Sequence, residues 1–513
     1  MSIRVLPERP HLDHLKHQAR QLLLDAQAGV AQAIERFSTA GVAAEGAKLA
    51  DALHVVALEY GFAAWPALKL HVTTLTADAE TAWAAALRSG DAAIAAEVLR
   101  RHPALRQKLD EPLPTLDFDM PPLVFAARLQ NRPLVDVLLD AGADPNARSQ
   151  WWAGGFGVLD CAEPELAEHL IARGATLDAH SAARLGKIDA LREMLDRNPE
   201  LVHARGGDGQ LPLHFAANPD VAELLLQRGA EVDARDIDHE STAAQYMAAD
   251  RARQPVVRLL LAHGAQPDLL MASALGDVQL VESLLDEDPD RIRSTASTRS
   301  FPQQNPRSGG TIYLYTFGVT KSPHLIAHEY SHPEALKLLI KRTPVWLRLV
   351  VAAELGDTAL METTLRLMPG GRVQLRGASA RRLVGVAVRN QAEAVKLLVE
   401  RGWPADAALE NGQTALHYAA WNGNLAMTQA LLAAGAPVHV FETEHRGSPL
   451  AWALHGSLHG TYRKTGEYPA VARALLEAGA PVPQPEGRPL EGAPEVLAIV
   501  EAAKSSPGTP LRA

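Results

Sequence analysis

Residues 412–436 read GQTALHYAAWNGNLAMTQALLAAGA, and this stretch carries both signals that decide the fold. It opens with Thr414, a favourable helix N-cap, ahead of a run of small and apolar residues. It closes with Leu431 and Leu432, two spacer residues and Gly435. Two apolar residues that face a core, followed by a glycine that can take a left-handed conformation, are typical of the end of an amphipathic helix.

The closing signal, an aliphatic pair followed by two spacers and a glycine, is repeated along the chain. Several separations between these glycines are similar: 142 to 174 is 32 residues, 229 to 264 is 35 and 402 to 435 is 33. A fixed period of this size is typical of stacked-repeat proteins, because one repeat cannot bury its own apolar face. The seven instances are Leu138-Leu139/Gly142, Leu170-Ile171/Gly174, Leu225-Leu226/Gly229, Leu260-Leu261/Gly264, Leu398-Val399/Gly402, Leu431-Leu432/Gly435 and Leu475-Leu476/Gly479.

The opening signal indicates the type of repeat. Residues 211–217 and 414–420 match the pattern Thr-Pro-Leu-His-x-Ala, and residues 120–127, 322–327 and 448–453 are looser versions. A Ser or Thr cap, a proline in the first turn and a face of small residues suit the start of a helix. On these motifs, residues 79–482 resemble an ankyrin repeat protein with about twelve repeats, several of them degenerate. The resemblance implies an all-α solenoid of helix-turn-helix repeats joined by short β-turn finger loops.

Four variant repeats lack the Gly-Ala ending but share another frame. In each, a glycine is followed 13 residues later by a proline. The glycine is expected to separate a first helix from a second helix, which ends before the proline. The intervals between these glycines predict a larger block of about three repeats. The pairs are Gly90/Pro103, Gly186/Pro199, Gly276/Pro289 and Gly356/Pro369.

The two ends of the chain differ from the array. Residues 11–28, 48–60 and 65–72 read as helices within an N-terminal capping region, residues 1–78. Residues 6–10 and 60–65 of this region resemble the leader found in many bacterial ankyrin proteins. At the other end, residues 483–513 are expected to form a cap helix over 494–503 and a frayed tail, since the open ends of a repeat array must be covered.

Composition excludes several classes of function. The formal net charge is −10, and no Lys- or Arg-rich run is present, which argues against nucleic-acid binding. The single Cys161 excludes an intramolecular disulfide and a cysteine-rich metal site. No stretch resembles a secretory signal or approaches the roughly 20 apolar residues of a membrane helix. We therefore expect a cytoplasmic protein with no membrane association and no cofactor.

Three insertions interrupt the repeat rhythm, at residues 149–158, 291–321 and 455–466, and the third is expected as a loop between the two helices of one repeat. They contain the aromatic residues Trp151, Trp152, Tyr313 and Tyr315. Residues 311–317 alternate polar-leaning and apolar side chains, which favours a strand or hairpin. Since insertions in repeat arrays tend to lie on the binding face, these segments are the best markers of a site.

One segment matches a zinc-protease motif, His328-Glu329-x-x-His332. That chemistry needs both imidazoles on one continuous helix. The repeat register instead starts a helix at Ser322-Pro323, ends it at 330–331 and starts the next at Pro333. The two histidines are therefore expected to lie on either side of a turn, and no metal site is predicted.

Asp238, His239 and Glu240 form a polar cluster ahead of a helix start. Local hydrogen bonding in a finger turn is the favoured interpretation. The alternative is a pair of carboxylates with an imidazole, which could perform acid/base chemistry. His324 and His328 lie four residues apart on one helix face, where they either pack against a neighbouring repeat or face the groove. No residue is assigned as catalytic, and enzymatic activity is left open but not favoured.

The favoured function is binding of a protein or peptide partner in the concave groove that a solenoid provides. The expected binding residues are Trp151, Trp152, Tyr313, Tyr315, His324, His328 and Trp421, because aromatic side chains dominate binding hot spots. The alternative is an enzyme or small-molecule receptor whose site lies near residues 236–242, 311–328 and 151–156.

Overall fold

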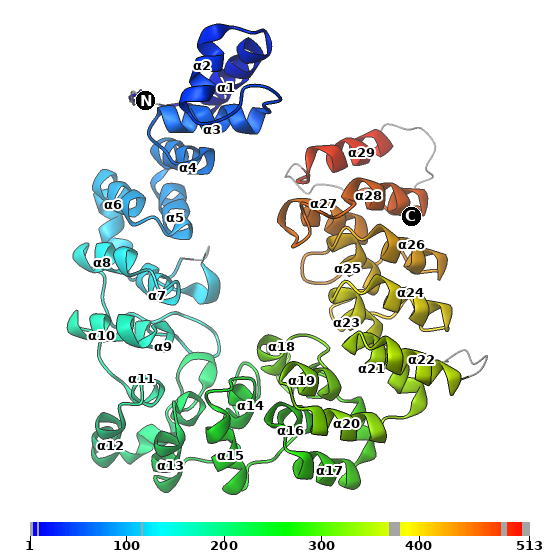
Figure 1. The fold of residues 1–513 in the computed structure, drawn as a ribbon. Helices are drawn as coiled ribbons and strands as arrows, with labels where there is room; N and C mark the ends of the chain where they lie inside the picture. Colours follow the sequence, from blue (N-terminus) through cyan, green and yellow to red (C-terminus); the bar gives the residue numbers. More distant parts are fainter. Residues whose placement is uncertain (1–3, 8–9, 114–115, 369–379, 484–489, 505–513) are drawn as a thin grey trace. The chain divides into compact units, whose positions relative to one another are not determined.

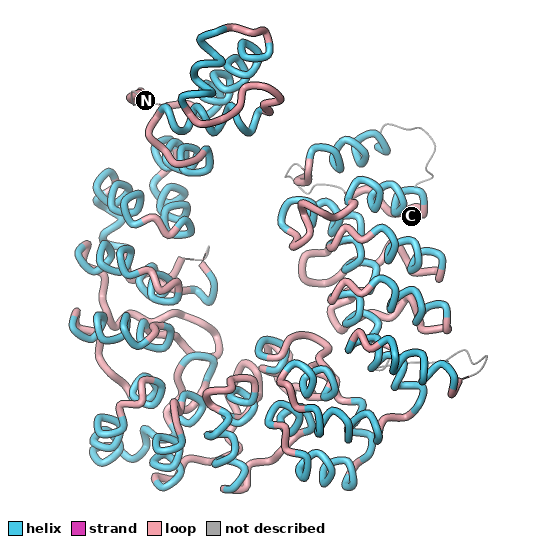
Figure 2. The backbone as a smooth tube through the Cα atoms, in the orientation of Figure 1, coloured by secondary structure: helices cyan, strands magenta, loops and turns pink. Residues whose placement is uncertain are grey.

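The computed structural model describes residues 4–7, 10–113, 116–368, 380–483 and 490–504 (Figure 1). Within these residues the chain forms helices, turns and loops without a β-strand (Figure 2). Two isolated β-bridges, Arg235 with Thr242 and Ala408 with Thr414, mark finger loops. Contacts divide the chain into two units, Met1–Ala230 and Glu231–Ala513. The predicted all-α repeat fold is confirmed.

The first unit contains α-helices and short 3₁₀ helices. The N-terminal helices are α1 (Leu12–Gln27), α2 (Ala31–Thr39), α3 (Leu49–Glu59) and α4 (Trp65–Thr76). The later elements are α5 (Ala79–Ser89), α6 (Ala92–Arg101), η1 (Pro103–Lys108), η2 (Asp117–Asp119), α7 (Pro122–Arg128), α8 (Arg132–Asp140), α9 (Val158–Cys161), α10 (Pro164–Ala172), α11 (Ala179–Arg184), α12 (Ile188–Arg197), η3 (Pro199–His203), η4 (Gly207–Gly209), η5 (Pro212–Phe215) and α13 (Pro219–Gln227).

The second unit is a stack of helix pairs. The first helices of the pairs are α14 (Ala243–Ala248), α16 (Leu269–Leu275), α19 (Pro323–Glu329), α21 (Val345–Leu355), α23 (Arg382–Val388), α25 (Ala415–Trp421) and α27 (Pro449–His459). The second helices are α15 (Gln254–Ala262), α17 (Val278–Glu287), α20 (Pro333–Arg342), α22 (Thr358–Arg366), α24 (Ala392–Glu400), α26 (Leu425–Ala433) and α28 (Tyr468–Glu477). Successive first helices contact one another, and we call them the first-helix row. The remaining elements are η6 (Pro289–Arg293), α18 (Tyr313–Thr316) and α29 (Pro494–Lys504).

The repeated aliphatic pairs act as the sequence predicts. The first member of each of the seven pairs is fully buried, and the second is partly or largely buried. Each following glycine takes a positive φ, between 82° at Gly435 and 103° at Gly174. A side chain with a Cβ is strained in that region, which is why glycine ends these helices.

The variant repeats also follow the predicted frame. Gly90, Gly276 and Gly356 cap the first helices in the left-handed conformation, and Gly186 follows α11 with a φ of 65°. Second helices α6, α12 and α17 end before their prolines, while Pro369 lies outside the described residues. One of the motifs that predict the start of a first helix gives a shorter element than expected. Residues 212–215 form only the 3₁₀ helix η5, because the backbone leaves the helical conformation at Ala216, where ψ is 115°.

At the N-terminus, the predicted helices correspond to α1, α3 and α4, and α2 is an additional helix that the sequence did not reveal. Buried residues of this region, from Leu15 to Val72, form one apolar cluster. At the other end, α29 packs on α27 and α28, with Val496 and Val500 buried. These contacts suit caps for the array, and the domain bounds 1–78, 79–482 and 483–513 stay predictions.

Two predictions for the insertions were wrong. Residues 313–316 form the helical turn α18 rather than a strand, because Tyr313 is drawn into the core and the following backbone closes i to i+4 hydrogen bonds. Residues 455–459 are not part of a loop either; they continue α27 by more than a turn. Among the described residues, no helix combines the length and apolar character needed to cross a membrane.

Candidate functional site

The 291–321 insertion packs on the finger loop at residues 236–242. Gly309 N–H donates to Asp238 Oδ1 at 3.0 Å, and the Glu240 carboxylate accepts the N–H groups of Gln304 and Asn305 at 2.8 and 2.6 Å. The His239 imidazole is 2.8 Å from Gly310 O through Nδ1. These contacts fix the insertion on the finger and occupy the polar cluster with long-range contacts that the turn interpretation did not include. The turn interpretation and the acid/base alternative both stay predictions.

The predicted binding residues near this insertion separate into buried and exposed groups. Tyr313 is fully buried, and its hydroxyl donates to Asp268 Oδ2 at 2.8 Å. His324 is also fully buried, with Nε2 2.6 Å from Thr343 Oγ1. Burial removes both side chains from any binding surface. Tyr315 is 64 % exposed, and its ring packs at a tilt against His239 with a centroid distance of 4.9 Å, so it stays a predicted binding residue.

Trp151 and Trp152 belong to a separate aromatic cluster in the first unit. Trp151 packs against Phe118 with ring centroids 5.0 Å apart, and Phe156 contacts the same ring at 5.6 Å. Both tryptophans are half-buried, and the rings of the pair are 6.3 Å apart. They stay predicted binding residues of the first unit, on a loop that is held by packing rather than freely exposed.

The zinc-protease motif is divided between two helices, as the register predicts. Helix α19 ends at Glu329, and α20 begins at Pro333. His328 is exposed near the end of α19, whereas His332 lies outside both helices with Nε2 2.9 Å from Ala274 O. The two imidazoles therefore do not share a helix face, which the metalloprotease arrangement requires.

Burial of His324 makes the fold sensitive to acid. Burial, with a smaller contribution from the charge of Arg382, holds the pKa of His324 well below its ordinary value of 6.5. Below pH 6.5 the unfolded chain binds a proton at this residue and the folded chain does not, so stability is lost as the pH falls. When the pH is lowered from 7 to 5.5, the free energy of unfolding should fall by about 1 kcal/mol less in His324→Gln than in the wild type. Urea denaturation at the two pH values measures the difference. An equal loss in the variant would contradict this assignment.

An aromatic pocket lies on the first-helix row between α25 and α27. It has a volume of about 470 Å³. Trp452 is at its centre, with ring centroids 5.2 Å from Tyr418 and 5.9 Å from Trp421, both edge to face. The His455 ring is 5.7 Å from Trp421. We call the set Tyr418, Trp421, Trp452 and His455 the aromatic pocket; Gln413, His445, Gly447 and Ala451 complete its lining.

Local sequence explains why these rings meet. Tyr418 and Trp421 are three residues apart on α25, and Trp452 and His455 have the same spacing on α27, so each pair shares a helix face. The two helices approach closely at Gly456, where an added Cβ would lie 2.5 Å from Trp421 O. The hydroxyl of Tyr468 donates to the same carbonyl at 2.8 Å. The end of α25 is therefore fixed beside α27.

This close approach gives a direct prediction. Gly456→Ala places a methyl group against the Trp421 backbone, which can move only if the two helices separate. We expect a loss of about 1–3 kcal/mol of unfolding free energy, as for other overpacked sites, in urea denaturation. Ala would otherwise favour the helix by about 1 kcal/mol over Gly, so a stabilised variant would show that the helices are not in contact here.

Carboxylates lie beside the pocket. Burial alone would raise the pKa of Glu442, but the N–H groups of Gly447, His445 and Glu444 that donate to it lower the pKa below its ordinary value. The pKa of Tyr418 is raised to about 12, mainly by burial and to a smaller extent by the charges of Glu444 and Glu442. The pKa of His455 is lowered, mainly by burial and to a smaller extent by the charge of His459. At neutral pH the site therefore combines an ionised Glu442 carboxylate with uncharged Tyr418 and His455 rings.

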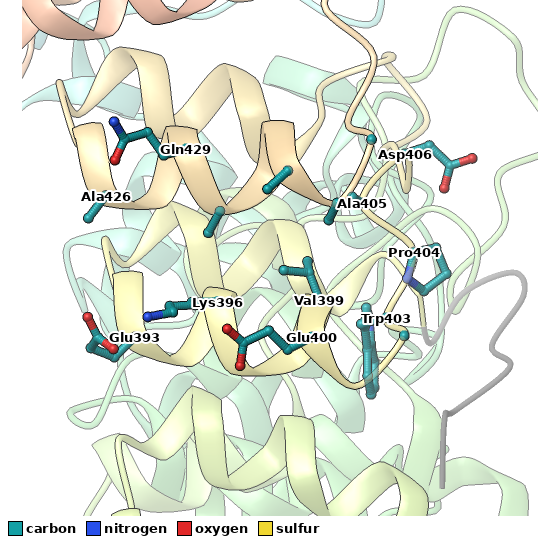
Figure 3. A pocket seen from close by; sticks show the side chains of 15 residues that line it. Glu393, Lys396, Val399, Glu400, Trp403, Pro404, Ala405, Asp406, Ala426 and Gln429 are labelled. Carbon is teal, nitrogen blue, oxygen red and sulfur yellow. The ribbon is translucent and has the colours of Figure 1, made fainter. Parts of the chain in front are cut away.

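A different kind of groove lies on the second helices. A groove of about 910 Å³ lies between α24 and α26. Glu393, Lys396 and Glu400 lie along one of its walls and Gln429 on the other (Figure 3). Its one tryptophan, Trp403, is 2 % exposed and donates to Ala380 O, so it serves the core. A groove of about 650 Å³ borders α24 on the side of α22. Such grooves repeat with helix spacing and offer no exposed aromatic anchor.

The sequence identified one member of the aromatic pocket, Trp421, and missed the rest. Trp452 and His455 are three residues apart, and His459 follows four residues later. This spacing could have indicated that the three rings share one face of a helix. The spacing alone does not tell which neighbouring helix this face meets.

The comparisons with known proteins give the repeat type. Family models match three segments: a single ankyrin repeat at residues 119–150, ankyrin repeats in three copies at 179–269, and ankyrin repeats in many copies at 386–432. Mouse ankyrin repeat and SAM domain-containing protein 6 is 30 % identical over 123 residues, which is 23 % of this chain and 14 % of that protein.

Two other relatives come from a fungus and a plant. Ankyrin repeat domain-containing protein SAT10 of Stachybotrys chartarum is 24 % identical over 356 residues, 59 % of this chain and 17 % of that protein. Serine/threonine-protein kinase VIK of Arabidopsis thaliana is 38 % identical over 78 residues, 15 % of this chain and 17 % of that protein. The chain thus spans less than a fifth of each relative. Together with the stacked helix pairs, these matches show that the chain contains ankyrin repeats in an all-α repeat solenoid.

Proposed function

We propose that the chain is a binding protein that holds a basic peptide segment of a protein partner at the aromatic pocket. The observation that supports this most strongly is the convergence of Tyr418, Trp421 and Trp452 on one cavity of about 470 Å³. Trp and Tyr rings that line a partly desolvated pocket carry a large share of the energy in protein interfaces. Ankyrin repeats are a scaffold on which such a surface is held rigidly.

The position of the pocket suits an extended partner. Its rings come from two consecutive members of the first-helix row, and Gln413 and His445 come from the finger loops ahead of those helices. A peptide that runs along the stack would therefore pass both the helix faces and the loops, which is the surface that repeat proteins vary to select partners.

Charge favours a basic anchor side chain. The Glu442 side chain is buried, and its carboxylate accepts the N–H groups of Glu444, His445 and Gly447, so it adds negative charge behind the pocket wall without contacting a ligand. Glu444 is exposed, and the ring faces of Trp and Tyr attract cations. The whole chain has a formal net charge of −10, which favours encounter with a positively charged partner. An arginine suits this set best, because a guanidinium can stack on a ring while it donates to an exposed carboxylate such as that of Glu444.

The test is a selection from a random peptide library displayed on phage, made in parallel on the full chain and on a Trp421→Ala/Trp452→Ala variant. We expect enrichment of peptides with Arg or Lys on the wild type and no enrichment of the same peptides on the variant. Far-UV circular dichroism of the variant verifies that it is folded. Equal enrichment on both chains would contradict the site, and apolar anchors in place of basic ones would contradict the proposed partner chemistry.

A further inference from the structure

A second, smaller cavity lies between the 291–321 insertion, the start of α23 and the finger loop at residues 409–410. Its volume is about 10 Å³, room for a single oxygen-sized atom. The surroundings are polar and rich in arginine, unlike those of the aromatic pocket. The polar lining residues on the insertion and on α23 are Thr295, Ser297, Arg299, Thr320, Arg381 and Arg382.

Two of these residues carry buried polar atoms without a hydrogen-bond partner. Arg382 is 1 % exposed, and its Nη1 has no partner. Thr320 is 4 % exposed, and its hydroxyl has none. A buried donor left without an acceptor costs about 1–3 kcal/mol, so native proteins rarely leave several in one place unless something else satisfies them.

The charges around the cavity are not balanced. The Glu354 carboxylate is fully buried and accepts Arg382 Nε at 2.7 Å and Ser322 Oγ at 2.8 Å. A second guanidinium, that of Arg389, lies near the same carboxylate, and its Nε and Nη2 are buried without a partner. Glu354 is therefore shared by two guanidinium groups, and Glu329 adds only a smaller favourable contribution at Arg389. Buried charges are stable only when they are paired.

The backbone holds Thr320 in place for this role. Ala296 N–H donates to Lys321 O at 2.9 Å, and Thr320 N–H donates to Ala296 O at 3.0 Å, which closes the base of the insertion. Thr320 has a φ of 62°, a strained conformation for a β-branched residue. A Cβ added at Gly385 would lie 2.3 Å from Thr320 Oγ1 and 3.7 Å from Arg389 Nη1, so the hydroxyl and this guanidinium lie close together over α23.

At the mouth of the cavity, further arginines are available. Arg299 is exposed and makes no ion pair within the described part of the chain. Arg381 pairs with Glu410. An anionic group at this position would therefore meet Arg299 first, with one of its oxygens entering toward Arg382.

The geometry points to an oxyanion-binding site that takes a phosphoryl group, with one oxygen between Arg382 and Thr320 and the remaining oxygens at Arg299. Arginine forks match the spacing of phosphate oxygens and bind them in pairs. A doubly charged group also supplies a counter-ion for Arg299 and adds negative charge beside Arg382, which shares the Glu354 carboxylate with Arg389. This site is distinct from the aromatic pocket and does not depend on peptide binding there.

The test uses inorganic phosphate with the full chain and four variants. Thr320→Val keeps the shape of the side chain and removes only the unpartnered hydroxyl. Arg299→Gln removes the charge at the mouth, and Arg473→Gln, an exposed arginine on α28, is the matched control. Affinity is measured by titration calorimetry, and the melting temperature is followed in phosphate, sulfate and acetate at equal ionic strength.

We expect phosphate to bind the wild type and Arg473→Gln equally, and to bind Thr320→Val and Arg299→Gln about tenfold or more weakly. Thr320→Ser, which restores the hydroxyl, should recover binding. Phosphate and sulfate stabilise most proteins by exclusion from the surface, so only the difference between chains counts. Equal melting shifts in all five chains, or no heat of binding in any, would overturn the site. A response to acetate as strong as to phosphate would make the ligand a carboxylate and overturn the phosphoryl assignment. A phosphoserine peptide that outcompetes free phosphate would identify a phosphorylated protein, rather than the free ion, as the source of the phosphoryl group.

Discussion

Replacing Trp421 with alanine is expected to weaken binding of a selected basic peptide by about 2–4 kcal/mol, or roughly 30- to 1000-fold. The indole is half-buried in the pocket and forms part of its wall together with Trp452 and His455. Its loss removes the face on which a cation would stack and opens the pocket to water. Fluorescence titration of a labelled peptide measures the change.

The matched control is Phe441→Ala. Phe441 is 53 % exposed in the loop between α26 and α27 and is not among the pocket residues. Its removal should change the affinity by less than about threefold, as expected of residues outside a hot spot. Because Trp421 and Trp452 touch, the double alanine variant should lose less than the sum of the two single losses. A Trp421→Ala chain that binds the peptide as tightly as the Phe441→Ala chain would contradict the proposed site.

Glu354→Ala is expected to lower the free energy of unfolding by about 3–5 kcal/mol. Glu354 is 2 % exposed on α21, and its carboxylate forms a bidentate pair with the buried Arg382 of α23. The substitution leaves Arg382 and Arg389 buried without a counter-ion, which costs more than the pair contributes. Urea denaturation followed by circular dichroism measures the loss.

An exposed ion pair on the next helix provides the comparison. Glu362 and Arg366 of α22 are more than two-thirds exposed, with 3.6 Å between Oε2 and Nη2. Solvent screens such a pair, so Glu362→Ala should change the unfolding free energy by no more than about 0.5 kcal/mol. Similar losses for Glu354→Ala and Glu362→Ala would show that the buried pair does not hold α21 to α23.

The fold could be predicted because its signals are local. The helix end formed by a buried Leu and a glycine with positive φ depends only on residues of that same helix. The signal at Gly435 and the signal at Gly479 therefore each predict where a helix ends. The proline after α17 marks the end of that helix for the same reason. Even the false zinc motif could be resolved from the sequence, because Pro333 fixes where the next helix starts.

The sites could not be predicted in the same way, because they arise between repeats. Tyr313 reads as an exposed loop aromatic, but Asp268, 45 residues earlier, accepts its hydroxyl and draws it into the core. Trp452 meets Trp421 only because Gly456 lets α27 approach α25. The Glu354–Arg382 pair likewise joins neighbouring first helices. Such contacts depend on the order and spacing of the stack, which a single sequence does not specify.

The most direct test of the aromatic pocket is ¹⁹F NMR of the full chain labelled with 5-fluorotryptophan. The eight tryptophans give separate probes, assigned by single substitution. On addition of a selected basic peptide, we predict that the resonances of Trp421 and Trp452 shift, while those of Trp83 and Trp403, each 2 % exposed, do not. A bound peptide that shifts other tryptophans and leaves Trp421 and Trp452 unchanged would contradict the account.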